Sequence, residues 1–277
     1  MELICHSHIT KSRTFNIRPI GDLQEGEAGF RKDLWKKWKQ DTMLDRDSLI
    51  IGMGDYSDKF RTTISNKLQG ALLGDDSATM QFDEMLMSEM QHLSDELKPF
   101  RHRIIGLHCG HHHHKLYTGS CTCQYLCQLL RVKHLGFVAM TCLSVNRCGS
   151  ISNITIFSTH GCGGASTVAS DLTNLERKIM PFWDADLFIR GHSTRAFVAE
   201  GNPISYLYKK GESLSIKNKK RVLVNAGGFM EGYTIGNQSY VERSNMPRIN
   251  LGWCVINVHL PSSKDELFRI TGKAETF

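Results

Sequence analysis

Five short apolar segments that end in glycine, aspartate or histidine constrain the fold most strongly. Each is a run of apolar, often β-branched residues, and each predicts a buried strand that leads into a glycine-containing loop. They cover residues 15–22, 48–55, 103–112, 153–161 and 185–192. Residues 221–228 and 253–260 predict two more strands.

Helical patterns lie between several of these strands. Apolar residues follow a three-to-four spacing over residues 82–97, and Pro99 ends that helix. A second apolar stripe covers residues 123–130. Strands that alternate with helices favour an α/β fold, in which ligands bind at the carboxyl ends of strands.

The side chains best suited to chemistry stand at those strand ends. Carboxylates and imidazoles together suit Zn²⁺, Mn²⁺ or Fe²⁺. Taken singly, each residue has a simpler role, such as a helix cap or a hydrogen-bonded structural histidine. Their occurrence at successive strand ends favours a metal site. The set consists of Asp22, Asp55, His111, His112, His160 and His192.

The order of these blocks resembles the calcineurin-like metallophosphoesterases, most closely the small phosphoesterases of phages and prophages. That family carries D-x-H, G-D-x-x-D, G-N-H-D/E, a histidine beside glycine, and G-H-x-H in this order. The resemblance spans about residues 15–260 and implies a four-layer α/β/β/α sandwich with two mixed sheets. We expect a single domain over residues 1–277, with residues 1–14 peripheral and residues 57–98 forming a helical insert or cap.

Sorted by the metal that each matched residue would bind, the residues lead us to infer that the second of two metal sites is strong. Asp55, within the complete block Gly54–Asp58, would bridge the two metals. His111 stands in place of the family's asparagine and, with His160 and His192, would bind the second metal. Three imidazoles and one carboxylate predict a tight site of the kind that holds zinc or iron.

The first metal site has lost ligands relative to the family. Asp22 matches the family's aspartate, but Gln24 and Thr194 stand where the family has metal-binding histidines. Both would be weak ligands at most. We therefore expect a weak second ion of a hard metal, Mn²⁺ or Mg²⁺, or a protein that binds one metal ion only.

The remaining assignments concern catalysis. His112 matches the family's histidine that contacts phosphate and protonates the leaving group, and His113 would orient it. Arg195 is a candidate phosphate contact beside the fifth block, and Arg61 is a weaker one. His114 has no assigned role and is expected to be exposed.

The implied activity is hydrolysis of a phosphoester by metal-bound hydroxide, with His112 as the general acid. A phosphodiester of DNA, RNA or a nucleotide is the preferred substrate, in keeping with a net charge of +6. The sequence contains no apolar stretch long enough to span a membrane and no signal peptide. These features predict a protein of the bacterial or phage-infected cytoplasm, whose oligomeric state the sequence leaves open.

Two other functions stay open. The altered first metal site is compatible with a scaffold that binds metal and a partner or nucleic acid without hydrolysis. The excess of cysteine and histidine also suggests a zinc-stapled nucleic-acid module that would use Cys121, Cys123 and Cys127. Cys123 and Cys127 lie on an apolar helical stripe, which favours core packing instead. Cys109 flanks the predicted ligands.

Two further segments have expected structures. Residues 34–40 combine Trp35 and Trp38 with lysines, and we expect a helix that buries the tryptophans and exposes the lysines. Residues 209–220 are polar and basic, and predict a hairpin or loop. We expect His6 and His8 to belong to a peripheral N-terminus.

Overall fold

A computed structural model describes most of the chain. The described residues are 1–59, 71, 76–163, 167–236, 240–243, 245, 248, 250–262 and 266–277. The predicted phosphate contact Arg61 lies outside them, as does part of the predicted insert over residues 57–98.

Strands dominate the described part of the chain. In order they are β1 (Glu2–Thr10), β2 (Thr14–Ile20), β3 (Leu49–Gly52), β4 (Ile104–Leu107), β5 (Val138–Arg147), β6 (Ser150–Thr159), β7 (Leu187–Arg190), β8 (Ala196–Lys210), β9 (Ser213–Gly228), β10 (Gly252–His259) and β11 (Arg269–Thr276). The helices are α1 (Lys32–Leu44), α3 (Asp76–Leu97), α4 (Thr122–Leu130), α5 (Val168–Lys178) and the short α6 (Tyr240–Arg243). This is the mixed α/β architecture that the sequence predicts.

The strands pair along one continuous path, β1-β5-β6-β7-β9-β10-β2-β3-β4, with β8 on β9 and β11 on β10. The path has two halves, which meet where Gly227 and Gly228 of β9 pair with Trp253 and Gly252 of β10. Each half mixes parallel and antiparallel pairs. The sequence predicts two separate mixed sheets, whereas the short β9–β10 ladder joins the two halves edge to edge.

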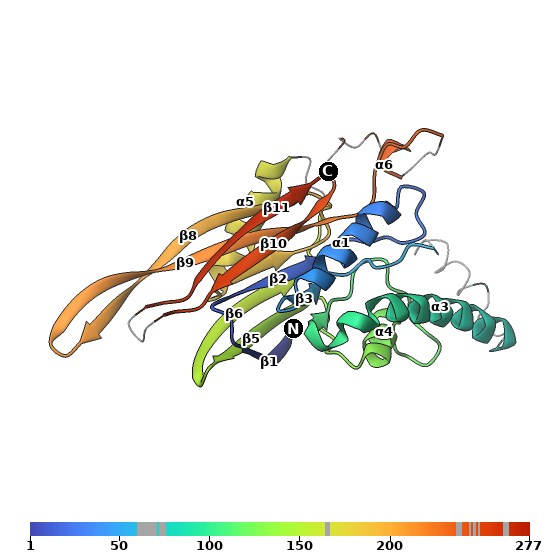
Figure 1. The fold of residues 1–277 in the computed structure, drawn as a ribbon. Helices are drawn as coiled ribbons and strands as arrows, with labels where there is room; N and C mark the ends of the chain where they lie inside the picture. The colour runs from blue at the N-terminus through green and yellow to red at the C-terminus, as the bar shows by residue number, and fades with distance from the viewer. Residues whose placement is uncertain are drawn as a thin grey trace.

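Three buried clusters hold these layers together. One fills the space between the two halves, where residues such as Ile51 and Ile105 meet Leu143 and Ile156. A second packs the outer face of β2, β3 and β4 against α1, α3 and α4. A third packs β6, β7 and β9 against α5 and the 3₁₀ turn Met180–Phe182. Helices therefore cover the outer face of both halves (Figure 1).

All seven strands expected from the apolar segments are present. Helix α3 covers the predicted stripe and ends at Leu97, where a 3₁₀ turn with proline in its first turn follows. In α1, Trp35 and Trp38 are buried as predicted, with 3% and 0% exposure. Their rings stack 5.1 Å apart against the sheet.

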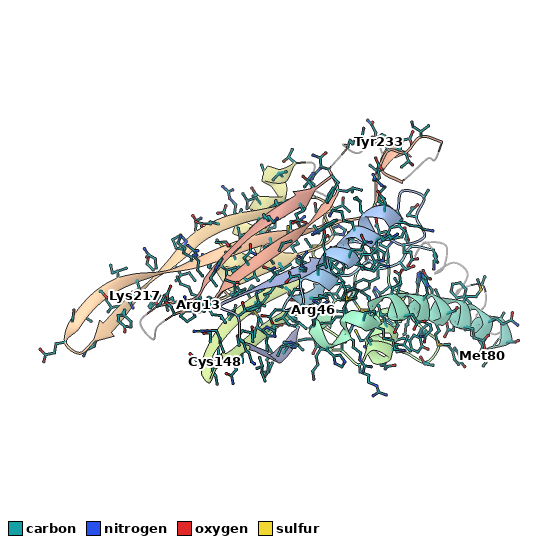
Figure 2. The ribbon with its side chains drawn as sticks, in the orientation of Figure 1. Arg13, Arg46, Met80, Cys148, Lys217 and Tyr233 are labelled. Atoms are coloured by element: carbon teal, nitrogen blue, oxygen red, sulfur yellow. The ribbon has the colours of Figure 1, made fainter. Side chains whose placement is uncertain are left out.

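Residues 209–220 lie at the turn of the β8–β9 hairpin. Figures 1 and 2 show this hairpin projecting from one end of the molecule, with Lys217 near its tip and Met80 of α3 at the other end. The Lys217 ammonium lies 3.6 Å over the Tyr208 ring.

Other features differ from expectation or go beyond it. His114 is 6% exposed, so the prediction that it is exposed was wrong. The apolar patterns did not indicate β1, which carries His6 and His8 and pairs in parallel with β5 at the end of the strand path. Among the described residues, no helix combines the length and hydrophobicity needed to cross a lipid bilayer.

Candidate metal centre

The two halves of the sheet each direct a set of strand ends toward one place. Strands β2, β3 and β4 run parallel, and the loops at their carboxyl ends carry Asp22, Asp55 and His111. Strands β6 and β7 also run parallel, and His160 and His192 directly follow them. Because the core packs the two halves face to face, residues from both can reach a common centre.

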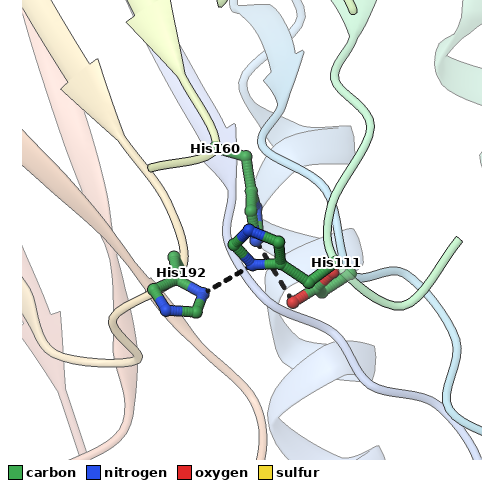
Figure 3. A group of neighbouring side chains, drawn as sticks. His111, His160 and His192 are labelled. Atoms are coloured by element: carbon green, nitrogen blue, oxygen red, sulfur yellow. Dashed lines mark hydrogen bonds and ion pairs between the residues drawn. The ribbon is translucent and has the colours of Figure 1, made fainter. Parts of the chain in front are cut away.

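Four of the predicted ligands converge (Figure 3). Asp55, His111, His160 and His192 each place one ligand atom within 4.8 Å of all the others. The Nδ1 atoms of His111 and His192 are 3.2 Å apart, and His160 Nε2 is 3.3 Å from Asp55 Oδ2. Ligand atoms about 2.0–2.1 Å from a tetrahedral ion are separated by about 3.3 Å, so these spacings suit a small divalent cation.

His160 provides the clearest test of that fit. It is fully buried, and its Nδ1 lies 2.7 Å from the carbonyl oxygen of Met53, to which the Nδ1–H donates. Its Nε2 has no hydrogen-bond partner although it is buried. A metal-binding histidine is typically held in this way, with one ring nitrogen fixed by a backbone carbonyl and the other directed at the ion. The residues present therefore fit a divalent cation.

The charges in the centre are strongly coupled. Burial acts against a charged His160, but the Asp55 carboxylate outweighs it and raises the pKa of His160 to about 9. Burial and the neighbouring His160 and His111 rings lower the pKa of His192 to about 4. Burial also lowers the pKa of His111. A cation bound here would displace the proton that His160 and Asp55 attract.

The backbone around the centre is held in an unusual conformation. Gln24, Asp55 and His192 have φ angles of 49°, 48° and 66°, in the left-handed region that non-glycine residues rarely adopt. Backbone strain of this kind is concentrated at functional sites. Close approach also requires glycine at position 110, where a Cβ atom would lie 1.9 Å from Asp55 Oδ1.

The predicted ligands of the first metal are only partly assembled. Asp22 is 2% exposed, and its Oδ1 accepts a hydrogen bond of 3.0 Å from the His192 backbone N–H. Burial and repulsion from Asp55 raise the pKa of Asp22 to about 7. The Oε1 atom of Gln24 is buried without a hydrogen-bond partner. Thr194 packs its methyl group against Gly228, where an added Cβ would lie 2.7 Å away.

His112 lies at the edge of the centre and is oriented by a residue that the sequence analysis did not single out. Its Nδ1 is 2.8 Å from Asp58 Oδ1, and its backbone N–H donates to Asp55 Oδ1. Burial lowers the pKa of His112, but the hydrogen bond to Asp58 and the charge of Asp55 raise it to about 9 overall. The expected orienting residue, His113, instead places its Nδ1 2.7 Å from the Gly110 carbonyl oxygen.

The signal for Asp58 was present in the sequence. It is the second aspartate of the block Gly54–Asp58, in which we assigned a role to Asp55 alone. Asp58 is buried, with 7% exposure. Its pairing with His112 could not be predicted, because the two residues lie in different loops that only the fold brings together.

Arg195 is tied to a second residue without a sequence assignment, Asp171 of α5. Its guanidinium lies 3.2 Å from Asp171 Oδ2, and Arg190 lies 3.1 Å from Asp171 Oδ1. The Ser193 hydroxyl donates to the same carboxylate at 2.8 Å. The fully buried Asp171 thus holds the loop that follows His192, and no spacing in the sequence links it to that loop.

No protein-family model and no curated protein matches the sequence. Among solved structures, the chain is similar to the crystal structure of Vps29 from Chaetomium thermophilum, with a TM-score of 0.37 and 11% identity over 95% of this chain and 98% of that chain. It is also similar to the same organism's Vps29 complexed with the RaPID-derived cyclic peptide RT-D3. That match has a TM-score of 0.29 and 11% identity over 96% and 97% of the two chains. At these values the similarity is slight, and a function has to be argued from the residues of the centre.

Proposed function

We propose that this chain is a metal-dependent phosphoester hydrolase. The observation that carries the proposal is the convergence of Asp55, His111, His160 and His192, with the buried Nε2 of His160 directed at the Asp55 carboxylate. Three imidazoles and one carboxylate favour zinc or iron at this position. Asp22, Asp55 and the Gln24 amide oxygen would form the weaker neighbouring site, for Mn²⁺ or Mg²⁺.

A divalent cation held there supplies a nucleophile at neutral pH and offsets charge on the phosphoryl oxygens. His112 donates a proton to the leaving oxygen, and Asp58 keeps its ring in position through the 2.8 Å contact. His113 lines the same pocket as Asp55 and His112, where it would contact substrate rather than orient His112. Arg195, held by Asp171, is proposed as a phosphate contact at the edge of the site.

The wider architecture is part of the proposal. Helices on both outer faces and a core between the two sheet halves support a four-layer α/β/β/α arrangement in one domain. The substrate class follows from the family that the ordered motifs resemble. A phosphodiester of a nucleic acid or nucleotide agrees with the net charge of +6.

A direct assay tests this function. The purified chain is freed of metal, reloaded with Zn²⁺, Fe²⁺ or Mn²⁺, and mixed with a chromogenic phosphodiester. We expect metal-dependent turnover that Asp55→Asn abolishes. The matched control is Asp47→Asn, which removes a carboxylate paired with Thr10 and His8 and should leave turnover intact.

The competing function is a metal-binding scaffold without catalysis. The position of Thr194 favours it, because a threonine methyl packed on Gly228 supplies no imidazole to the first metal site. Protein that binds metal at full occupancy but turns over no phosphodiester or phosphomonoester would support the scaffold and overturn the hydrolase.

A further inference from the structure

A second group of metal-binding side chains lies beside the loop that carries His111 and His112. Cys109, Cys123 and His134 each place one ligand atom within 4.8 Å of the other two. Cys121 extends the group, because its Sγ is 3.6 Å from the Sγ of Cys109. None of these atoms belongs to the centre described above.

The spacings agree with those of a zinc site. Thiolate sulfurs about 2.3 Å from a tetrahedral Zn²⁺ are separated by about 3.8 Å. The 3.6 Å between Cys109 and Cys121 is close to that value. The Nε2 atom of His134 lies 3.1 Å from Cys109 Sγ, slightly closer than the about 3.5 Å expected around a tetrahedral ion, so the two side chains would move apart by a few tenths of an ångström.

The group is assembled by three separately anchored segments. Cys109 follows β4, and its backbone N–H donates to the Gly136 carbonyl at 2.9 Å. His134 lies opposite Leu107 in a parallel β-bridge, which fixes it beside that strand end. Cys121 is the N-cap of α4 in a capping box with Gln124, and Cys123 lies in the first turn. Backbone contacts and one helix cap therefore bring the four residues together.

Convergence of the thiols on an imidazole distinguishes this group from ordinary core cysteines. Cys109 and Cys123 are each 3% exposed, whereas Cys121 and His134 are half-buried and leave a route for an ion. Cys127 of the same helix is also 3% exposed and, like Cys123, donates its thiol to a backbone carbonyl, but it is not grouped with an imidazole. Core packing is enough to explain the buried position of Cys127. Core packing does not explain why the thiols of Cys109, Cys121 and Cys123 converge on His134.

We propose that Cys109, Cys121, Cys123 and His134 bind one structural Zn²⁺. The ion ties the start of α4 and the segment 133–136 to Cys109, immediately before the turn that carries His111 and His112. Three sulfurs and one imidazole form a closed tetrahedral set of the kind used for structural zinc. This site is independent of the proposed hydrolase and would exist equally in a scaffold. It revises the expectation that Cys123 serves only in core packing.

Cobalt substitution separates this site from the Asp55 centre. Co²⁺ bound by thiolates gives a sulfur-to-metal charge-transfer band in the near ultraviolet, whereas Co²⁺ held by histidines and carboxylates gives none. We expect the full chain, purified under reducing conditions and loaded with Co²⁺, to show this band. Cys109→Ser and Cys123→Ser should lose the band, and His160→Ala should keep it. Cys127→Ser is the matched control and should also keep it.

A measurement on the unaltered chain covers the case in which the cysteine variants do not fold. A thiol reagent is applied to zinc-loaded and chelator-treated protein, and the modified cysteines are identified by mass spectrometry. Zinc should protect Cys109, Cys121 and Cys123 and leave Cys5 and Cys148, which are exposed, equally reactive. Absence of the band together with equal labelling in both samples would overturn the proposal, as would a Cys109–Cys121 disulfide that accounts for the protection.

Discussion

His160 Nε2 lies 3.3 Å from Asp55 Oδ2, although the two residues follow strands in different halves of the sheet. The histidine is fixed from behind by the Met53 carbonyl, and its inward nitrogen has no hydrogen-bond partner. A proton on this nitrogen would pair with the Asp55 carboxylate, and a bound cation would replace that proton and take both groups as ligands. This relationship leads to the first prediction.

Replacing His160 with alanine should remove the tightly bound ion. The change deletes a buried ligand, so the metal content of purified protein should fall by about one equivalent, as measured by elemental mass spectrometry. His113→Ala is the matched control, because His113 contacts the Gly110 carbonyl and is not in the ligand group. Equal metal content in both variants would rule out the proposed ligand set.

Replacing His112 with alanine should slow hydrolysis without releasing metal. General acid catalysis contributes about 10²–10⁴-fold, so kcat should fall by that factor for substrates with poor leaving groups. The loss should be much smaller for a nitrophenolate leaving group, which departs without protonation. Steady-state kinetics on the two substrate types measures the difference, and an equal loss on both would exclude His112 as the acid.

Asp58→Asn should act only through His112. The asparagine keeps a hydrogen-bonding side chain but loses the carboxylate that holds the imidazole at 2.8 Å. We expect kcat to fall about 10–100-fold with KM and metal content unchanged. A double-mutant cycle checks the mechanism: in the His112→Ala background, Asp58→Asn should cause no further loss. Additive losses would show that Asp58 acts elsewhere.

Gly110→Ala should destabilise the fold and disturb the metal centre together. The new Cβ would lie 1.9 Å from Asp55 Oδ1 and 2.2 Å from the Asp55 backbone nitrogen, so the loop must move. Overpacking of this kind costs about 1–3 kcal/mol of unfolding free energy. Gly119→Ala is the control for backbone strain alone, because a Cβ there has no atom within 4 Å although the φ of +85° disfavours a side chain. Metal content should separate the two variants, since only Gly110→Ala displaces Asp55.

Glu96→Gln should reduce stability at neutral pH and have little effect in acid. Lys39 Nζ and Trp35 Nε1 each lie 2.6 Å from the Glu96 carboxylate. Burial opposes the charged form, but these contacts hold the pKa of Glu96 below its ordinary value of 4.5. The stabilisation is therefore complete above pH 4.5 and is lost as the pH falls through the lower folded-state value.

The cost of Glu96→Gln should be up to about 1 kcal/mol at pH 7, because the pair is partly exposed to solvent. Urea unfolding at pH 7 and at pH 3 measures the difference from the unaltered chain. Asp95→Asn, on the same turn of α3, is the control for removing an exposed carboxylate from this helix. A difference that grows in acid would contradict the sign of the shift.

Much of the secondary structure was predictable because it depends on local pattern. The strands β3, β4 and β7 read as short runs of mainly apolar residues, since every residue in them is buried. Strands β1 and β5 were missed because they alternate between buried and exposed residues and contain many polar side chains. Helix α5 was missed for a similar reason, since Leu175 is its only fully buried apolar residue among those described.

The candidate ligands could also be found from the sequence, because each follows a recognisable strand. The residues that orient His112 and Arg195 could not be found in this way. Asp58 lies 54 residues from His112, and Asp171 lies 24 residues from Arg195. Pairings of this kind depend on how loops from different strands pack. The role of His113 as an orienting residue and the exposure of His114 were inferred from adjacency in sequence, which does not fix the direction of a side chain.

The sequence alone thus determined which residue types stand at the strand ends, and with them an α/β fold and the kind of ion that such ligands prefer. Local hydrophobic pattern and turn residues carry that information. The tertiary structure decided which of those residues share a centre, which carboxylate holds His112, and that Cys109 and His134 meet the cysteines of α4. Distances between loops are set by the packing of the two sheet halves around their common core, and no spacing along the chain encodes them.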